Sequence, residues 1–393
     1  MQPTLRFPEF KDVWSYNLFS NIVTNKSKKF NPSKEPATND IELDSIEQNT
    51  GRLLNTYMSN QFTSQKNIFN KNSVLYSKLR PYLNKYYYSQ IDGVCSSEIW
   101  VLNTLNKDVL SNKFLYYFIQ TNRFNSVANK SAGSKMPRAD WGLVENIRLY
   151  KGTIEEQEKI GEFFSKLDQQ IELEEKKLEL LKQQKRGYMQ KIFSQDLRFK
   201  DENGNEYSKW VTQKIKELGN VYTGNTPSKK QSANWNSNNY IWVTPTDINN
   251  KKDIKNSEYM LSDEGFKKAR QLPKNTLLIT CIASIGKNAI LREVGSCNQQ
   301  INALVPNNDK NVDFLYYAFE KVSKYMKRIA GKTATQIVNK STFKNISIEV
   351  PNLEEQLKIG IFLNSFDKLI EKKVSKIELL KQRKQGLLQK MFV

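Results

Sequence analysis

The sequence has 393 residues, three cysteines, no histidine and a formal net charge of +20 from 61 basic and 41 acidic residues. Without histidine, the chain cannot carry a Ser–His or Cys–His nucleophile pair, a histidine general base or a histidine-ligated metal, and its charge predicts a polyanionic partner. The three cysteines, Cys95, Cys281 and Cys297, are scattered, which predicts a reducing cytoplasm and neither disulfides nor a zinc site. The sequence has no apolar signal region and no run of 18 apolar residues, so we predict neither export nor a membrane anchor.

Residues 1–152 are predicted to form a first globular domain of mixed helices and strands. Their 20 basic and 12 acidic residues give this domain a net charge of +8. Residues 73–76 and 97–102 are rich in β-branched and aromatic side chains and are bounded by turn formers, which predicts strands. The apolar run at 114–120 predicts a helix, and the loop 131–140 (SAGSKMPRAD) follows it.

Residues 153–194 carry heptads and are almost neutral, with 8 basic and 9 acidic residues. Apolar residues recur there at spacings of three and four, which predicts a coiled-coil helix rather than a strand. A helix of about 40 residues is a rod of roughly 60 Å.

Residues 195–351 repeat the order of the first domain and carry a net charge of +9. The FLYY run at 114–117 returns at 314–317, and strands are predicted at 240–244 and 277–280. The positive charge therefore lies mainly in the two globular segments. That distribution suits two DNA- or RNA-binding heads on a spacer better than a basic tail.

Residues 352–393 repeat the first predicted helix at a constant offset of 199. Matched heptads favour a mutual pair of helices over two unrelated solvated helices. The predicted fold is therefore α+β, with head, helix, head and helix forming an internal pseudo-twofold repeat. The residues predicted to pair the two helices are Phe164, Ile171, Glu174, Leu178, Leu181, Leu363, Ile370, Lys373, Ile377 and Leu380.

Glu174 and Lys373 occupy the same heptad position near the midpoints of the two predicted helices. If the helices pair antiparallel with full overlap, these side chains meet, and a buried pair of opposite charge would fix the register and the orientation. Two exposed polar breaks are the alternative. Lys185 and Lys384 also interrupt the apolar seam, where their alkyl stems can still cover apolar surface.

Short motifs recur along the chain in a specific order. An E-E-Q triplet near the start of both helices contains Glu156 and Glu355. The second head contains G-N-T-P-S at 224–228, W-V-T-P-T-D at 242–247, I-G-K at 285–287 and N-Q-Q-I-N at 298–302, and the first contains S-K-L-R-P-Y at 77–82. In this order, and over essentially the whole chain, the motifs resemble the specificity subunit of type I restriction–modification systems.

The resemblance implies target-recognition domains at 1–152 and 195–351. They would be held apart by an antiparallel coiled coil of two conserved helices, at 153–194 and 352–393. Each domain would read one half of a bipartite double-stranded DNA sequence. The helices would set the unread spacer and dock two modification (methyltransferase) subunits, and restriction (translocase/nuclease) subunits join such complexes in the family. S-adenosylmethionine, and ATP with magnesium, are then expected only in partner subunits. The first head departs from the family pattern, because K-F-N-P-S-K at 29–34 replaces the G-x-T-P-S loop.

The sequence also lacks the motifs that catalysis by this chain would need. Met326 stands where the first glycine of a nucleotide-binding loop ending at Gly331-Lys332-Thr333 should be, and no D/N-P-P-Y/F tetrapeptide is present. Glu371 and Lys373 have the E-x-K spacing of a metal nuclease but lie on a predicted helix. We therefore predict a non-enzyme. A two-headed RNA- or DNA-binding coiled-coil scaffold without restriction partners is the alternative.

The basic loops of the two heads supply candidate DNA contacts. Lysine and arginine neutralise phosphates, arginine and amide side chains read base edges, and glycine allows the backbone a close approach. A single lysine is more often a solvated charge, so the prediction rests on the clustered loops. The candidates are Lys26, Lys28, Lys29, Lys78, Arg80, Gly133, Lys135 and Arg138 in the first head, and Gly224, Asn225, Lys229, Lys230, Lys287, Gly331, Lys332, Thr333 and Thr335 in the second.

Overall fold

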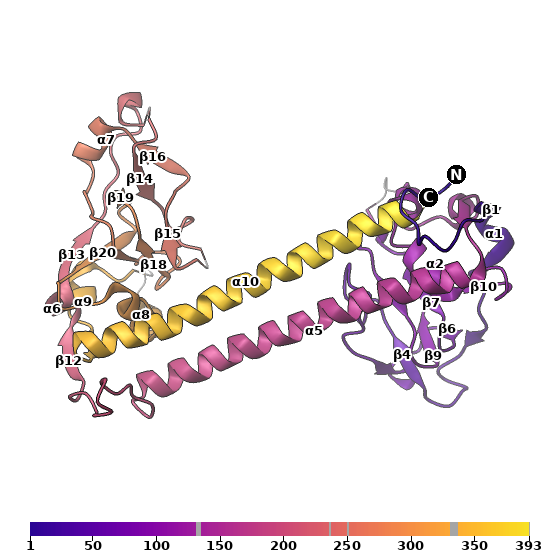
Figure 1. The fold of residues 1–393 in the computed structure, drawn as a ribbon, viewed down its shortest axis with the longest axis horizontal. Coiled ribbons are helices and arrows are strands. Elements are labelled where there is room, and N and C mark those ends of the chain that lie inside the picture. Colours follow the sequence, from indigo (N-terminus) through magenta and orange to yellow (C-terminus); the bar gives the residue numbers. More distant parts are fainter. Residues whose placement is uncertain (131–134, 236, 250, 331–336, 393) are drawn as a thin grey trace. The chain divides into compact units, whose positions relative to one another are not determined.

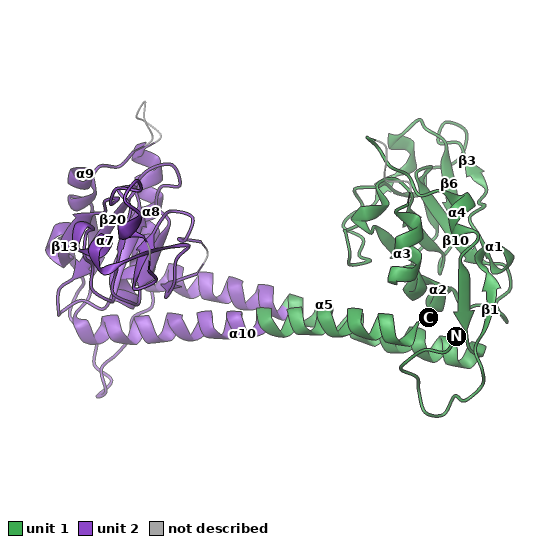
Figure 2. Ribbon diagram, turned by 90° about the horizontal axis from the view of Figure 1, so that it is seen from above, with its two compact units in different colours: residues 1–176, 374–393 green, residues 177–373 purple. Residues whose placement is uncertain are grey.

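The computed structural model describes residues 1–130, 135–235, 237–249, 251–330 and 337–392, which form two compact units (Figure 1). Unit 1 contains Met1–Lys176 and Val374–Val393, and unit 2 contains Lys177–Lys373 (Figure 2). The two long helices that the heptads predicted are α5 (Ile154–Phe193) and α10 (Leu353–Met391). Each unit therefore combines one globular head with part of both long helices.

The head of unit 1 contains two sheets and a two-stranded ribbon. In the antiparallel ribbon, β1 pairs with β11, while the sheets have the strand orders β2-β10-β7-β8 and β3-β6-β9-β4-β5. The predicted strands at 73–76 and 97–102 correspond to β7 and β10. The strands are β1 (Ser15–Leu18), β2 (Val23–Thr24), β3 (Lys29–Phe30), β4 (Asn39–Ile41), β5 (Tyr57–Met58), β6 (Lys66–Phe69), β7 (Val74–Ser77), β8 (Tyr86–Tyr88), β9 (Gly93–Ser96), β10 (Ile99–Thr104) and β11 (Arg148–Lys151).

The helices of this head are short and cover the four-stranded sheet. They are α1 (Phe19–Ile22), α2 (Asn112–Phe118), α3 (Asn122–Ala128) and α4 (Trp141–Val144), with 3-10 turns η1 (Ser59–Gln61) and η2 (Pro81–Leu83). Helix α2, predicted at 114–120, is buried because it packs against both the sheet and α5. Its Phe114 and Tyr117 join a core that also contains Ile160 and Phe164 of α5 and Leu388 of α10.

The head of unit 2 repeats this order with one more strand in its central sheet. The ribbon pairs β12 with β21, the central sheet has the order β13-β20-β17-β18-β15, and a three-stranded sheet has the order β16-β14-β19. The predicted strands at 240–244 and 277–280 are β14 and β17. The strands are β12 (Val211–Lys214), β13 (Gly219–Thr223), β14 (Tyr240–Val243), β15 (Asp253–Ile254), β16 (Tyr259–Leu261), β17 (Thr276–Thr280), β18 (Asn288–Leu291), β19 (Gly295–Cys297), β20 (Ile301–Pro306) and β21 (Ser347–Val350).

The helices of unit 2 include α8, which contains the second FLYY run. They are α6 (Ile215–Leu218), α7 (Asp263–Lys268), α8 (Val312–Ala330) and α9 (Lys340–Lys344), with the 3-10 turn η3 (Ser232–Asn234). The core of this head contains Ile192 and Phe193 of α5 and Ile359 and Leu363 of α10. Each head thus packs on the first turns of one long helix and on the last turns of the other.

The E-E-Q triplets fasten each head to the start of its long helix. In unit 1 the fully buried Glu156 accepts hydrogen bonds from Arg6 (2.6 and 2.8 Å) and from the indole of Trp14 (2.9 Å). In unit 2 Glu355, also fully buried, accepts from Arg198 (3.2 and 2.6 Å) and from Trp210 (3.1 Å). A buried carboxylate needs such charged and polar partners, which explains why the triplet recurs.

The glutamine of each triplet bonds to the backbone of its own head. Gln157 accepts from the amide of Ser111 (3.0 Å) and donates to the carbonyl of Val109 (3.1 Å). Gln356 accepts from the amide of Asn311 (2.8 Å) and donates to the carbonyl of Asp309 (3.3 Å). The side chain replaces backbone partners that the start of α2 or α8 would otherwise lack.

The two long helices are antiparallel in each unit, and their seam is partly polar. Of the residues predicted to pair them, Phe164, Ile171, Glu174, Leu363 and Ile377 are buried, whereas Leu178, Leu181, Ile370, Lys373 and Leu380 are half-buried. Within unit 1, Glu174 accepts from Lys376 (3.0 Å), three residues beyond Lys373. Lys373 belongs to unit 2, so its pairing with Glu174 stays a prediction.

Candidate nucleic-acid interface

In the head of unit 1, two of the predicted basic loops lie against each other. We call residues 78–81 and 135–139 the loop pair of head 1. The amide of Arg80 donates to the carbonyl of Pro137 (2.8 Å), and the amide of Ala139 donates to the carbonyl of Lys78 (2.7 Å). The structure therefore brings Lys78, Arg80, Lys135 and Arg138 together, and all of them except the half-buried Lys78 are exposed.

The backbone of Arg80 is left-handed, with a φ of 51°. This conformation is uncommon for a residue with a side chain, and such residues cluster at functional sites. Arg80 follows the end of the central strand β7 by three residues, so a rigid sheet positions it. The neighbouring Arg138 is paired with Glu98, whose carboxylate accepts from its Nε (2.9 Å) and Nη2 (3.3 Å). This hydrogen bond raises the pKa of Arg138 and fixes the direction of its guanidinium.

The predicted lysines of 26–29 lie elsewhere in this head. All three are exposed, and Lys29 lies on β3 at the edge of the five-stranded sheet. Its amine donates to Asn67 (2.7 Å) on β6. Lys26 and Lys28 lie in the connection that precedes β3. These lysines therefore belong to the five-stranded sheet and the connection that leads into it, rather than to the loop that follows β7.

The head of unit 2 contains the same loop pair, which we define as residues 281–287 and 337–340. The amide of Val338 donates to the carbonyl of Cys281 (3.0 Å), and Ile282 forms a β-bridge with Ile337. Ala283 follows the end of β17 by three residues, as Arg80 follows β7, and it too is left-handed with a φ of 60°. The two heads therefore share an unusual backbone position but carry different side chains there. Lys287, a predicted contact, is exposed on this loop.

Two of the predicted contacts in unit 2 support the loop backbone. The side chain of Asn225 donates to the carbonyl of Lys268 (2.8 Å) and accepts from the amide of Arg270 (2.6 Å). A Cβ atom at Gly224 would lie 2.2 Å from the carbonyl oxygen of Cys297, so only glycine fits this close approach. Asn225 thus positions the chain around Arg270, and its amide is already hydrogen-bonded.

Lys229 and Lys230, also predicted contacts, are exposed beside an aromatic group of the three-stranded sheet. The amine of Lys229 lies 5.1 Å from the ring centre of Tyr259 and 6.0 Å from that of Trp242. Trp242 in turn donates to the carbonyl of Asn225 (3.0 Å). The aromatic rings hold the lysine stem while its charge stays accessible to solvent.

Sequence reasoning missed a group of three cations in unit 2, Arg270, Lys340 and Lys344. The pKa of Lys340 is lowered, first by burial and then by the positive charges of Lys344 and Arg270, so the three charges interact. Arg270 is exposed and lies over the ring of Tyr222, 5.4 Å from its centre. Like charges held close together favour a bound polyanion. The basic run K-K-A-R at 267–270 was the available signal.

Five predicted contacts, Gly133, Gly331, Lys332, Thr333 and Thr335, lie outside the described residues. Within the described residues, no helix is long and apolar enough to cross a membrane, and no group of three or more acidic or cysteine side chains is arranged to hold a metal ion. The three cysteines are buried, and burial raises the pKa of Cys281 to about 11. Such a thiol stays protonated and unreactive near neutral pH.

Comparison with known protein families identifies the chain. The profile of the family described as "Type I restriction modification DNA specificity domain" matches it twice, at residues 18–183 and 207–382. Each match covers most of one head and most of the long helix that follows it, so the repeat seen in the structure is a repeat of this domain.

The chain belongs to the type I restriction–modification DNA specificity family.

Several curated relatives are specificity subunits of this family. The chain is 34% identical over 190 residues to the type I restriction enzyme MjaIX specificity subunit of Methanocaldococcus jannaschii, covering 47% of this chain and 44% of that one. It is 29% identical over 174 residues to the HindI specificity subunit of Haemophilus influenzae, covering 42% and 38%. These matches span less than half the length of either relative. A longer match, 25% identical over 323 residues, joins 75% of the chain to 72% of the M. jannaschii MjaVIII specificity subunit.

Solved structures from type I restriction–modification systems share the fold over nearly the whole chain. A chain from work on complex assembly and conformational transition of the type I R-M system superposes with a TM-score of 0.64, at 16% identity, covering 96% of this chain and 97% of that one. The type I restriction–modification S subunit from M. genitalium superposes with a TM-score of 0.59, also at 16% identity, covering 100% and 99%. At this identity the likeness concerns the fold, in which heads alternate with long helices.

Proposed function

We propose that the chain reads a bipartite double-stranded DNA sequence, with one head for each half, as the specificity subunit of a type I restriction–modification complex. The observation that carries the proposal is the twofold match to the DNA specificity domain. In support, each match includes a head with a loop pair that follows its central strand. A site built twice in one chain fits a target that has two parts.

The loop pairs have the chemistry that DNA recognition requires. In head 1, Arg80 is a long, planar donor on a rigid strand end, suited to bidentate contact with guanine in the major groove. Lys135 lies beside it and suits a phosphate contact, which positions the protein without reading sequence. In head 2 these roles would fall to Lys287 and Lys340 of the loop pair, together with Arg270 and Lys344, whose charges act on Lys340. Because Arg80 and Ala283 differ at the matching position, the two heads would read different bases.

The long helices supply a surface for partner subunits in two equivalent copies. The E-L-L-K-Q motif of both helices leaves its first leucine exposed, Leu180 in unit 2 and Leu379 in unit 1, with 63% and 65% of each residue accessible. An exposed leucine at the same repeat position in both units fits a partner that binds twice. We assign this surface to two modification (methyltransferase) subunits, with restriction subunits joining the complex through them.

Catalysis then belongs to the partners. Methyl transfer from S-adenosylmethionine, and ATP- and magnesium-dependent cleavage, would take place in the modification and restriction subunits of a cytoplasmic complex. Among the described residues, burial raises the pKa of all three cysteine thiols, and the fully buried carboxylates of Glu156 and Glu355 are paired with arginines. Its contribution is to place the partners on a chosen DNA sequence.

Mapping methylated bases tests the proposal directly. The chain is co-expressed with a candidate modification subunit in a methylation-deficient host, and methylated bases are mapped along the genome. The expected result is methylation at a split motif with a fixed unread gap, lost when this chain is omitted. Methylation that does not depend on the chain, or none with a partner that does bind it, would favour a nucleic-acid-binding scaffold instead.

A further inference from the structure

Each unit contains a polar triad that joins its head to both long helices. In unit 1 the hydroxyl of Tyr117, on α2, donates to Asp168 of α5 (3.0 Å). The other carboxylate oxygen of Asp168 lies 2.7 Å from the amine of Lys384 on α10. Lys384 is almost fully buried, and its amine also donates to Gln120 (3.0 Å).

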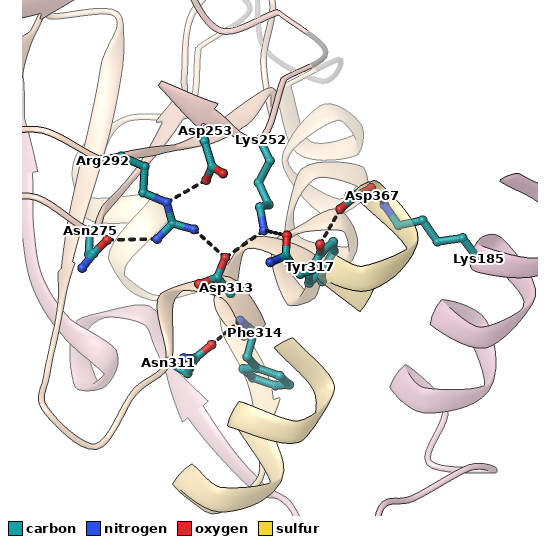
Figure 3. Close-up of polar contacts among 11 residues, drawn as sticks. Lys185, Lys252, Asp253, Asn275, Arg292, Asn311, Asp313, Phe314, Tyr317 and Asp367 are labelled. Carbon is teal, nitrogen blue, oxygen red and sulfur yellow. Dashed lines mark hydrogen bonds and ion pairs between the residues drawn. The ribbon is translucent and has the colours of Figure 1, made fainter. Parts of the chain in front are cut away.

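The triad of unit 2 has the same three residue types (Figure 3). Tyr317 on α8 donates to Asp367 of α10, and the amine of Lys185, on α5, lies 2.5 Å from the other oxygen of that carboxylate. The amine also lies 5.1 Å from the centre of the Tyr317 ring. The tyrosines match at the repeat offset of 200 and the aspartates at 199. The two lysines exchange roles, because each comes from the other long helix.

These lysines are the ones that interrupt the apolar seam in the sequence. Apolar seam residues accept a neighbouring apolar partner after a slip of one turn, whereas these two ammonium groups do not, since each would lose its carboxylate. Only 7% of the Lys384 side chain and 18% of the Lys185 side chain is exposed. Burial, together with the adjacent aspartate, raises the pKa of Tyr117 and of Tyr317, so both hydroxyls stay protonated and act as donors. Each triad is therefore satisfied in one arrangement of its three helices.

We propose that the Tyr117–Asp168–Lys384 and Tyr317–Asp367–Lys185 triads are the register pins of the helix pair. Each pin selects which turn of α10 faces which turn of α5, and its tyrosine fixes the head to that same turn. The consequence for DNA rests on the function proposed above: if the helix pair sets the unread gap, the pins hold that gap to a single length.

The register can be measured without DNA. Nitroxide labels are placed at Gln169→Cys and Gln385→Cys, two exposed helix positions of unit 1, while the native cysteines are buried. An apolar variant combines Tyr117→Phe, Asp168→Leu, Lys384→Met, Tyr317→Phe, Asp367→Leu and Lys185→Met. We expect a single label distance in the unaltered triads. The apolar variant should add a population displaced by about 5 Å for a slip of one turn or about 10 Å for a heptad.

A matched control removes an exposed ion pair of α5 instead, with Glu172→Gln and Lys176→Gln, and should keep the single distance. An apolar variant that also keeps the single distance would overturn the proposal. If the apolar variant does not fold, a variant in which the aspartate and lysine of each pin are exchanged tests the proposal instead. Exchanging the charges of both pins (Asp168→Lys with Lys384→Asp, and Asp367→Lys with Lys185→Asp) should restore one distance, whereas changing only the aspartates to lysine should not. Equal behaviour of these two variants would refute the pins.

The DNA consequence is measured separately by methylation mapping with the modification subunit. The apolar variant should methylate sites with more than one gap length, while the chain with intact pins methylates sites with one. If the apolar variant shows two label distances but methylates sites with a single gap length, the helix register does not set the gap. If the intact chain directs no methylation to a split site, the proposed function fails, but the label distances still report on the pins.

Discussion

The two units attach their heads to the long helices through the same residue types, but the central sheets of the two heads differ in their strands. Glu156 and Glu355 bind equivalent arginine and tryptophan partners, and each triad has the same three residue types. The central sheets differ: that of unit 2 gains the strand β15, parallel to β18, whereas that of unit 1 ends at β8. The framework that positions the heads is thus repeated almost unchanged, and the difference lies within the heads.

The extra strand of unit 2 brings a charged network with it (Figure 3). Arg292 contacts Asp253 (2.7 Å), Asn275 (2.9 Å) and Asp313 (2.6 Å). Lys252 joins Asp313 (2.8 Å) to Asn364 of α10 (2.6 Å). This network ties the sheet edge, the start of α8 and the long helix together.

Unit 1 has an open hollow of about 480 Å³, lined by Tyr88 of β8 and by residues 70–73 before β7. Asn72, which precedes β7 as Asn275 precedes β17, lines this hollow. Both asparagines are left-handed, so the turn is shared even though its surroundings are not. The comparison teaches that the glutamate anchors and the triads recur in both units, while the sheet edges and loops vary. On the function proposed above, variation at these places would let two similar heads recognise different sequences.

The largest predicted effect follows from breaking the shared framework. Changing Glu355 to alanine leaves the Arg198 guanidinium and the Trp210 indole without their buried partner, which should destabilise unit 2 by about 3–5 kcal/mol. Glu156→Ala should do the same to unit 1. Denaturant unfolding followed by hydrogen exchange in each unit measures both changes. The exposed Glu162→Ala is the control, and a loss below about 1 kcal/mol for either buried glutamate would contradict an equivalent role.

The next effect concerns unit 2 alone. Burial by itself would raise the pKa of Asp313, but the hydrogen bond from Lys252 and the charge of Arg292 outweigh it and lower the pKa below its ordinary 3.8. The carboxylate therefore stabilises the folded state above about pH 4, and this contribution is lost as the pH falls through the lowered pKa. Asp313→Asn should cost about 2 kcal/mol at pH 7 and flatten the acid limb of the stability curve for unit 2.

Acid unfolding monitored separately in the two units checks this prediction. Lys113 occupies the matching position in unit 1, so Lys113→Gln is the matched control and should leave the acid limb of unit 2 unchanged. An Asp313→Asn protein with the acid sensitivity of the unaltered chain would show that the network adds no pH-dependent stability.

The framework was predictable from the sequence because it is repeated there. Heptads and the constant offset of 199 predicted α5 and α10, and the E-E-Q triplets marked their first turns. The roles of Glu156 and Glu355 were not predictable, since Arg6 lies 150 residues away from Glu156 along the chain. Lys185 and Lys384 were recognised as interruptions of the seam, but their aspartates lie on the other helix, in a register that the heptad pattern leaves open.

The candidate interface was only partly predictable. The basic loops were visible in the sequence, and two of them in head 1 do lie together. That Asn225 hydrogen-bonds to the backbone around Arg270 depends on a contact across 45 residues, which composition does not reveal. Arg270 itself was missed because its partners Lys340 and Lys344 come from a distant helix. Side chains brought together by the tertiary fold leave no periodic signal.

Substituting one arginine in each head tests whether the two heads read their halves of the target independently. Arg80→Ala should relax the sequence at one half of the split target, with a loss of about 1–3 kcal/mol in discrimination, and leave the other half unchanged. Arg270→Ala should relax the opposite half. Methylation mapping of each variant gives the sequence preference at both halves. Relaxation of both halves by either single change would mean that the heads do not read independently.

The smallest predicted effect distinguishes a phosphate contact, which positions the protein on DNA, from a contact that reads bases, within the loop pair of head 1. Lys135 is exposed beside Arg80, and Lys135→Ala should weaken binding to all sequences alike without changing the preferred bases. The slope of log affinity against log salt should become shallower by about 1, because one phosphate contact and its released counterion are lost. Titrations of the complex with the modification subunit, at several salt concentrations, measure the slope. Lys11→Ala, an exposed lysine before β1, is the control, and an equal change in both variants would show that the effect is one of net charge rather than of this loop.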